Sequence, residues 1–405
     1  MHRYYALQNI HSDSIITAQY KMQPFEKPEI FAQEIAINIA VWYNIFWRQR
    51  MKIIHCADLH LGSKMESRLD ASKAKIRRDE ILYNFDRLAE YARTNGVNVI
   101  IIAGDFLDTD TATYNTREHI LDVINGYSDI IFVYLCGNHD KDSLLRKAQL
   151  PQNLRNFGAE WKSFECPEDV VITGKEGKLD NSDYQGLKLN PDKFNIVVLH
   201  GQEFVGQKAD GELINLKALQ NKYIDYLALG HIHSYKQEKL DNRGVYAYSG
   251  CLEGRGFDEC GPKGFVLLDI HDKKLHSTFV PFMKREYIEI KVDITGLYSF
   301  YDISQKCNAS VANIGANNIV RLILTGEYTL DTDKNTSMLQ HQLENKFFYA
   351  DVKDETSLYI SPETYKNEVS LVGEFLRQVE DSNLSDQEKQ DVMTAGLKII
   401  KEARE

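Results

Sequence analysis

Seven side chains of the types that bind divalent metal ions follow directly on runs of apolar residues. Each offers a carboxylate or amide oxygen or an imidazole nitrogen, and none is a cysteine. Such a donor set suits Mn²⁺, Fe²⁺ or Zn²⁺ better than Ca²⁺ or a structural zinc ion. The candidate metal ligands are Asp58, His60, Asp105, Asn138, His200, His231 and His233.

The local spacing of these residues favours a shared site. Residues two apart on an extended chain point the same way, so Asp58 with His60 can present two ligands to one side. His231 and His233 have the same spacing, and glycines precede three of the ligands, which permits tight turns and close backbone approach. Each short pattern alone is common by chance, but all of them together, each after an apolar run, predict a metal site.

The apolar runs themselves indicate an α/β fold. Short runs rich in β-branched residues alternate with helical segments, and residues 77–93 carry an apolar stripe at helical spacing. In open α/β sheets, ligands bind beyond the carboxyl ends of the strands. We therefore expect strand ends to bring the candidate ligands together. The expected strands lie near residues 52–57, 97–103, 130–136, 196–199, 226–229, 245–248 and 265–270.

The sequence divides into four predicted parts. Residues 1–50 carry no chemistry-bearing motif, and both an accessory extension and an upstream-start artefact stay open for them. A catalytic domain is expected at 51–283 and a small α+β cap at 287–350. Residues 351–405 are expected to be helical, with a capping box at Ser385 and Glu388 opening the last helix.

Composition limits the possible environments. The six cysteines form no CxxC pair, so a zinc knuckle or a disulfide framework is not expected and a reducing cytoplasm is favoured. No run reaches the roughly 18 apolar residues of a membrane span, so no membrane association is expected. The net charge of −11 is mildly unfavourable for binding nucleic acid, although a local basic face can coexist with it.

The ordered blocks DxH, GD, GNHD, H and GHxH resemble the metallophosphoesterase superfamily over about residues 51–282. The resemblance implies a sandwich of two β-sheets flanked by helices, with two divalent metal ions that activate water for attack on phosphorus. It assigns Asp58, His60 and His233 to one ion, Asn138, His200 and His231 to the other, and Asp105 as a bridge. His139 would be the general acid. Asp140 would orient His139 or simply form a turn or helix cap.

Further blocks resemble the nuclease subunit of SbcD-like DNA repair exonucleases and their YhaO-type relatives. These blocks are His60 to Gly62, Gly104 to Asp108, and Tyr248 to Phe265, although Ser249 and Cys251 depart from the usual Y-P-G-S of that group. The resemblance implies a Mn²⁺-dependent DNA exonuclease or endonuclease, a capping domain, and a helical tail that docks on an SMC-like coiled-coil ATPase. A homodimer is usual in such proteins.

Basic residues after two of the ligand blocks are candidates for contacts with DNA phosphates, the alternative being an ordinary solvated surface. A stand-alone phosphoesterase acting on small diesters or phosphoproteins is the alternative enzyme, and the acidic net charge mildly favours it. A non-catalytic scaffold is a third possibility, which the complete ligand set argues against. The DNA-contact candidates are Arg68, Lys73, Lys75, Arg77, Arg78 and Lys141.

Overall fold

The computed structural model describes residues 50–65, 69–108, 112–137, 140, 150–204, 213–329, 332–359 and 369–402. The chain divides into two units, Met1–Gln49 and Arg50–Glu405, and the fold described here is that of the second unit. The expectations for residues 1–50 therefore lie, apart from Arg50, outside the described residues.

The first sheet has six strands in the order β14-β13-β1-β2-β3-β4. The strands β1 to β4 run parallel to one another, and β13 and β14 are added antiparallel at one edge. Their bounds are β1 Arg50–Cys56, β2 Val99–Ala103, β3 Ile131–Leu135, β4 Leu154–Asn156, β13 Gly264–His271 and β14 Lys274–Pro281.

The second sheet also has six strands, in the order β11-β12-β10-β7-β6-β5. Its four inner strands are parallel, and β5 and β11 are antiparallel edge strands. Their bounds are β5 Lys162–Glu165, β6 Val170–Gly174, β7 Phe194–His200, β10 Tyr226–Gly230, β11 Lys236–Lys239 and β12 Val245–Tyr248. A short separate pair consists of β8 Gln202–Phe204 and β9 Leu213–Asn215.

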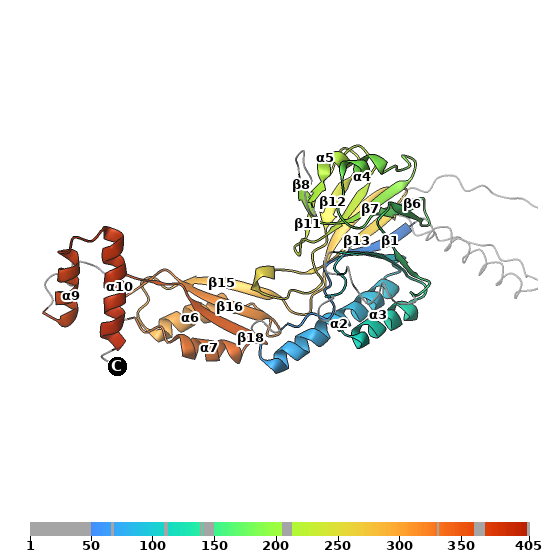
Figure 1. The fold of residues 1–405 in the computed structure, drawn as a ribbon. Coiled ribbons are helices and arrows are strands. Elements are labelled where there is room, and N and C mark those ends of the chain that lie inside the picture. The colour runs from blue at the N-terminus through green and yellow to red at the C-terminus, as the bar shows by residue number, and fades with distance from the viewer. Residues whose placement is uncertain are drawn as a thin grey trace, which may run out of the picture. The chain divides into compact units, whose positions relative to one another are not determined.

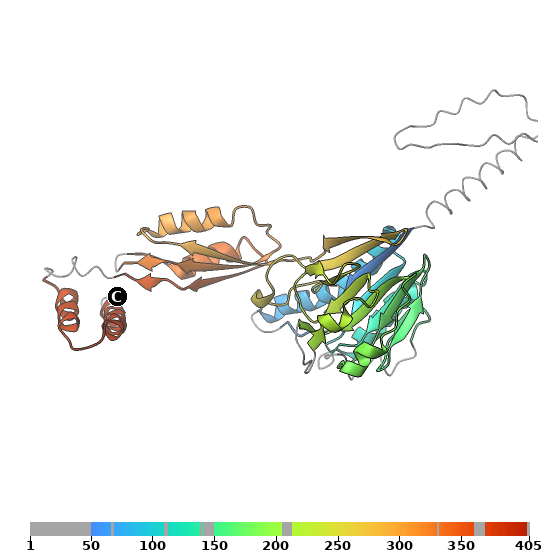
Figure 2. The ribbon, with the colours of Figure 1, turned by 90° about the horizontal axis from the view of Figure 1, so that it is seen from above.

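The two sheets pack face to face, with helices on their outer faces (Figures 1 and 2). Ile53 of β1 lies in the core between the sheets, whereas its neighbour Ile54 lies in the core beneath the helices. Successive strand residues point to opposite faces, so a strand buried on both faces is apolar throughout. The predicted α/β sandwich is confirmed. The helices are α2 Ala71–Thr94, α3 Tyr114–Gly126, α4 Asn181–Gly186 and α5 Leu216–Leu219.

The segment after the sandwich forms a three-stranded parallel sheet with its own core, which we call the cap. Its strand order is β15-β16-β18, and residues of helices α6 and α7 share the apolar core of one sheet face. The strand register places Tyr287, Ile319 and Tyr349 side by side on the three strands. These three residues form a row on the face opposite the helices. The bounds are β15 Tyr287–Asp293, α6 Phe300–Ser310, β16 Ile319–Thr325, α7 Thr336–Glu344 and β18 Tyr349–Asp354.

The chain continues into helices α9 Leu371–Glu380 and α10 Asp386–Glu402, preceded by the two-stranded pair β17 Glu327–Tyr328 and β19 Ser357–Leu358. The two helices share a small apolar cluster that includes Leu376 and Leu397. The predicted capping interaction is present, because Ser385 N and Oγ donate to Glu388 Oε2 at 2.9 and 2.7 Å. Within the described ranges, no helix is long and apolar enough to cross a membrane.

Candidate metal centre

The candidate ligands lie where strands of both sheets end. Asp58 and His60 follow β1, Asp105 follows β2, and His200 ends β7. The loops after β1 and β2 are tied together, because the Asp58 amide donates to the Gly104 carbonyl and the His60 amide to the Asp105 carbonyl, both at 3.0 Å. These backbone bonds hold the carboxylates of the first sheet at fixed positions opposite the histidines of the second.

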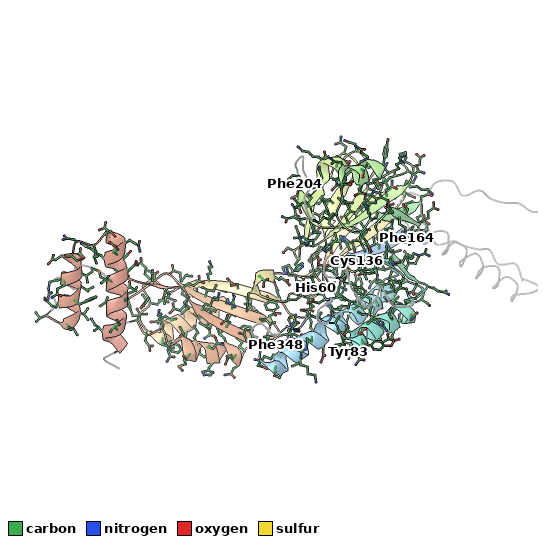
Figure 3. The ribbon with its side chains drawn as sticks, viewed as in Figure 1. His60, Tyr83, Cys136, Phe164, Phe204 and Phe348 are labelled. Carbon is green, nitrogen blue, oxygen red and sulfur yellow. The ribbon has the colours of Figure 1, made fainter. Side chains whose placement is uncertain are left out.

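Two groups of side chains are close enough to hold a metal ion. In one, ligand atoms of Asp58, His60 and His233 all lie within 4.8 Å of one another. In the other, the same holds for Asp58, Asp105 and His200, and His200 Nε2 lies 3.3 Å from Asp105 Oδ2. The first group is the set that the family resemblance assigned to one ion. Figure 3 labels one of its members, His60.

The second group differs in part from the expected one. Asp105 and His200 share it with Asp58, and the ring of His231 lies 5.4 Å from the ring of His200, centroid to centroid. The expected ligand Asn138 and the expected general acid His139 lie outside the described residues. Six of the seven candidate ligands are therefore placed near one another by the fold, and their oxygen and nitrogen donors fit divalent cations.

Four of these candidate ligands have an unusual backbone conformation. Asp58, His60, Asp105 and His231 have φ values of 53°, 44°, 48° and 100°, in the left-handed region that side chains other than glycine seldom adopt. Such conformations cost about 1–3 kcal/mol each and persist where the surrounding structure enforces them, often at functional sites. The backbone strain therefore coincides with the residues singled out by chemistry.

Two glycines allow the close approach of the ligand segments. A Cβ atom at Gly104 would lie 2.1 Å from His200 Nδ1, and one at Gly137 would lie 2.2 Å from Asp105 Oδ1. Both contacts would be severe clashes, so any larger residue would displace a candidate ligand. The glycines of the GD and GNHD blocks are thus required by packing around the centre.

Hydrogen bonds fix the orientation of two candidate histidine ligands. His200 Nδ1 donates to the Ala103 carbonyl at 2.9 Å, and His233 Nδ1 donates to Glu259 Oε1 at 2.7 Å. A metal-bound histidine commonly donates its second ring nitrogen to a carbonyl or carboxylate, which fixes the tautomer. With Nδ1 occupied in this way, Nε2 is the atom that remains to bind a cation in both side chains.

Sequence reasoning missed Glu259. This residue belongs to the short 3-10 helix η2, Phe257–Glu259, and its carboxylate also accepts from the Arg255 amide at 2.8 Å. Burial opposes its charge, but the hydrogen bond to His233 and the charge of Arg255 lower the pKa of Glu259 to about 2. Glu259 lies 26 residues after His233 in the chain, and no sequence motif connects the two residues. Their contact is therefore seen only in the tertiary structure.

The electrostatics of the centre favour a bound cation. Burial raises the pKa of Asp58 to about 6, and the nearby Asp105 carboxylate adds to the effect. Burial disfavours a charged His200, but its hydrogen bond to Asp105 and the two carboxylate charges raise the pKa of His200 to about 9. Two buried carboxylates side by side are costly unless positive charge compensates them.

The Asp140 carboxylate binds three backbone amides, and its expected partner His139 lies outside the described residues. Its carboxylate accepts from the amides of Phe106 at 3.0 Å, Leu107 at 2.8 Å and Gly137 at 3.1 Å. These bonds join the segment after Asp105 to the start of the GNHD block. Asp140 therefore positions two ligand-bearing loops, a role that the expected orientation of His139 did not include.

One DNA-contact candidate is corrected by the structure. Arg77 is fully buried, where its guanidinium donates to Glu80 Oε2 at 2.7 Å and to Glu253 Oε2 and the Gly254 carbonyl at 2.9 Å. Arg285, in the segment leading to the cap, also donates to Glu80. The side chain of Arg77 joins α2 to the loop after β12 and is not available to a phosphate.

Three of the remaining basic candidates, Lys73, Lys75 and Arg78, lie in the N-terminal part of α2. Lys75 is exposed, and Arg78 donates to the Lys64 carbonyl at 2.9 Å. Lys73 is partly exposed, with Nζ 5.7 Å from the ring centroid of Tyr349 in the cap. Arg68 and Lys141 lie outside the described residues.

Residues 51–235 match a family model described as calcineurin-like phosphoesterase. The match supports assigning this segment to the calcineurin-like metallophosphoesterase superfamily, and with it hydrolysis of phosphoesters by a metal-dependent domain. The expected superfamily is thereby supported for this part of the chain, whereas the SbcD-like subgroup stays a prediction.

Three solved structures are similar to parts of the chain. A dimetal phosphatase from Danio rerio has 10% identity and a TM-score of 0.38, covering 57% of this chain and 99% of that one. Purple acid phosphatase PPD1 from yellow lupin (Lupinus luteus) has 12% identity and a TM-score of 0.36, covering 57% and 51%. The nuclease MPE of Pseudomonas putida has 13% identity and a TM-score of 0.26, covering 56% and 87%. At these TM-scores the similarities carry no argument about substrate.

Proposed function

We propose that the calcineurin-like phosphoesterase segment of this chain is the catalytic part of a Mn²⁺-dependent DNA nuclease that acts in DNA repair. The observation that carries the proposal is the convergence of Asp58, His60, Asp105, His200 and His233 at the strand ends of two sheets. Oxygen and imidazole donors at such distances suit a pair of divalent cations.

The side chains of the centre would bind and orient the reacting groups. When bound, two divalent cations would supply a water of lowered pKa and positive charge opposite the phosphate oxygens. The Nδ1 bonds of His200 and His233 hold their Nε2 atoms ready as ligands. His139, named from the sequence, would donate a proton to the leaving oxygen.

Three features support DNA over a small substrate. The sequence blocks around Gly104 to Asp108 and Tyr248 to Phe265 resemble those of SbcD-like nucleases. A separate cap follows the catalytic segment, and Lys73 and Lys75 lie at the start of α2 on the chain segment that follows the loop bearing Asp58 and His60. Lysines there could contact a phosphate backbone without regard to base sequence.

The test compares two substrates with one protein. The purified full chain is incubated with Mn²⁺ and end-labelled duplex or single-stranded DNA, and separately with bis(p-nitrophenyl) phosphate, each with and without EDTA. We expect cleavage of DNA that EDTA abolishes. Hydrolysis of the small diester with no cleavage of either DNA would overturn the nuclease proposal and favour the stand-alone phosphoesterase.

A second measurement tests the general acid. We expect His139→Ala to retain Mn²⁺ binding but to lose about 100- to 10,000-fold in DNA cleavage rate, the usual contribution of a positioned acid. Binding is measured by isothermal titration calorimetry and cleavage by gel electrophoresis. Normal turnover by this variant would remove His139 from the proposed mechanism.

We also propose that α9 and α10 dock on an SMC-like coiled-coil ATPase, and that the nuclease is a homodimer. The two helices leave Leu371 and Ile399 about two-thirds exposed, at 67% and 66%. Exposed apolar residues of this size suit a helical partner. Size-exclusion chromatography with light scattering tests whether the protein is a dimer. Co-purification with the ATPase tests the docking of α9 and α10, and we expect Leu371→Glu to abolish it.

A further inference from the structure

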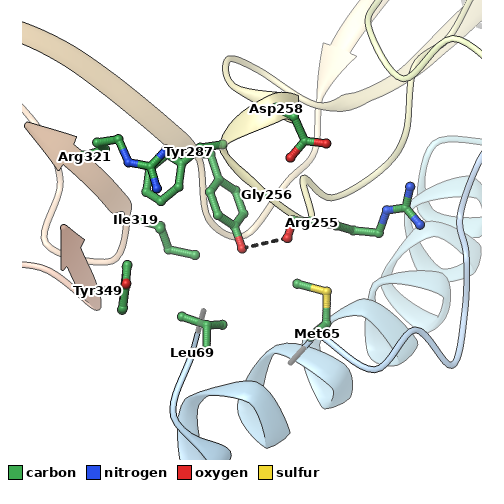
Figure 4. A pocket seen from close by; sticks show the side chains of 10 residues that line it. Met65, Leu69, Arg255, Gly256, Asp258, Tyr287, Ile319, Arg321 and Tyr349 are labelled. Carbon is green, nitrogen blue, oxygen red and sulfur yellow. Dashed lines mark hydrogen bonds between the residues drawn. The ribbon is translucent and has the colours of Figure 1, made fainter. Parts of the chain in front are cut away.

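A pocket lies between the cap and the loop after β12, with a volume of about 420 Å³ (Figure 4). We call it the junction pocket. Its volume falls in the range of about 300–1,000 Å³ that is typical of small-molecule sites. The lining residues that matter here are Leu69, Phe257, Tyr287, Ile319, Arg321 and Tyr349.

Three of the ten residues that line the junction pocket carry aromatic rings, namely Phe257, Tyr287 and Tyr349. Tyr287, Ile319 and Tyr349 form one row across the three cap strands, on the face opposite the helices. From the catalytic side, the Phe257 ring meets the Tyr287 ring edge to face, with centroids 5.2 Å apart. The guanidinium of Arg321 lies 3.8 Å from the centroid of the same Phe257 ring. Arg321 and Tyr287 are almost fully buried, at 3% and 4% exposure, whereas the Tyr349 ring is partly exposed and could stack on a planar group.

The guanidinium of Arg321 is fixed by an acidic partner in the cap. It is 3% exposed, and its Nε donates to Asp351 Oδ2 at 2.7 Å. Its Nη2 atom lies 2.7 Å from the same oxygen without hydrogen-bond geometry, and has no acceptor among the residues that the structure describes. The ion pair with Asp351 therefore holds the guanidinium of Arg321 against the Phe257 ring, at the wall of the pocket.

The junction pocket is next to the candidate metal centre. Arg255 lines the pocket, and its Nη2 lies 3.2 Å from Nδ1 of the candidate ligand His233. The Tyr287 hydroxyl donates to the Arg255 carbonyl at 3.3 Å, which joins the cap to the same segment. A nucleotide with its phosphate at the metal centre would therefore have its neighbours within reach of the pocket.

We propose that the junction pocket binds an unstacked base of the DNA strand, close to the phosphate that is cleaved. The proposal rests on the proposed nuclease function and names a subsite for it. A nucleobase is planar, offers carbonyl and ring-nitrogen acceptors, and stacks on aromatic rings whatever its identity. Lys73, whose Nζ lies 5.7 Å from the Tyr349 ring, could contact the phosphate of the same nucleotide.

Abasic nucleotides provide the test. Two labelled 20-mers, one of thymidine and one made wholly of abasic nucleotides, are titrated in EDTA with the full chain and followed by fluorescence anisotropy. In the wild-type protein we expect the abasic strand to bind at least about 5- to 150-fold more weakly, the usual contribution of one stacked base. Tyr349→Ala should weaken binding of the thymidine strand similarly and reduce the difference between the two strands.

Three further variants separate loss of stacking from damage to the fold. Tyr349→Phe keeps the ring and should bind like wild type, whereas Leu69→Trp fills the pocket and should behave like Tyr349→Ala. Tyr301→Ala, at an exposed ring on α6 of the cap, is the matched control and should bind normally. Circular dichroism should show that all four variants keep the wild-type fold, and Tyr301→Ala, which is outside the junction pocket, should hydrolyse bis(p-nitrophenyl) phosphate within about twofold of wild type.

The outcomes distinguish this inference from the nuclease proposal. If wild type cleaves DNA but binds the two strands equally, or if Tyr349→Ala binds the thymidine strand normally, the base subsite is overturned and the nuclease proposal stands. If thymidine monophosphate binds in a Tyr349-dependent way while strands do not bind, the pocket is a mononucleotide site and the inference is overturned. If wild type neither binds nor cleaves DNA, both proposals fail.

Discussion

Nδ1 of His233 lies 2.7 Å from Oε1 of Glu259, so a candidate metal ligand is oriented by a carboxylate from another segment of the chain. The same carboxylate accepts from the backbone and side chain of Arg255, which lines the junction pocket. The loop after β12 therefore contributes to both the candidate metal centre and the neighbouring pocket.

Glu259→Gln should weaken Mn²⁺ binding by about 10- to 100-fold, because a metal-bound histidine loses affinity when its orienting partner is changed. The amide keeps the shape of the side chain but not its charge. Isothermal titration calorimetry measures the affinity, with Glu327→Gln on the exposed strand β17 as the control. Equal affinities in the two variants would show that the Glu259 carboxylate does not support the centre.

Asp140→Asn should lower the free energy of unfolding by about 2–3 kcal/mol. The carboxylate accepts from three backbone amides, and an amide side chain would place its own donors against at least one of them. Urea denaturation followed by circular dichroism measures the change. We also expect weaker Mn²⁺ binding, because the segment after Asp105 is held by these bonds. A variant as stable as wild type would contradict the positioning role.

Asp58→Asn should stabilise the metal-free protein while abolishing tight metal binding. The pKa of the folded-state carboxyl is raised to about 6, so above pH 6 its buried negative charge destabilises the fold. Asparagine removes that charge and tolerates the left-handed backbone at this position. We expect a gain of about 1–3 kcal/mol at pH 7.5 in EDTA. Asp272→Asn, at an exposed position, is the control, and a lower melting temperature for Asp58→Asn would contradict the explanation.

Mn²⁺ affinity should rise with pH between about 6 and 9. His200 has a pKa of about 9 in the metal-free protein, so at pH 7 its imidazolium must lose a proton before it can bind a cation. Each pH unit should then increase affinity about tenfold, and below pH 6 the dependence should steepen as Asp58 also becomes protonated. Calorimetry in buffers of different ionisation enthalpy reports the released proton. An affinity that does not change over this range would rule out a charged His200.

The strand ends were predictable because donor residues there interrupt long apolar runs. His60 and Asp105 could be named from their positions after the apolar runs that form β1 and β2, and the structure shows that these two strands are neighbours in the sheet. The burial of Arg77 could also have been predicted, since it lies four residues before Ile81 on the buried stripe of α2. The positive charge of Arg77 suggested a contact with DNA, whereas its position on the apolar face of α2 indicated that the side chain is buried.

Other features had no signal in the sequence. Glu259 meets His233 only because two loops after different strands fold against each other, and no spacing rule connects them. The three amides that Asp140 binds lie 3 to 34 residues from it in the chain. The row of Tyr287 and Tyr349 likewise depends on the register of three parallel strands.

The amino-acid sequence by itself determined the donor types, their order, and the strands that end at them, because apolar periodicity and ligand chemistry are local properties of the chain. Only the tertiary structure decided which donors share a cation, which groups orient them, and where the cap leaves a pocket beside them. Those features depend on distances between segments that are far apart in the chain, and such distances are set by the packing of one sheet on the other.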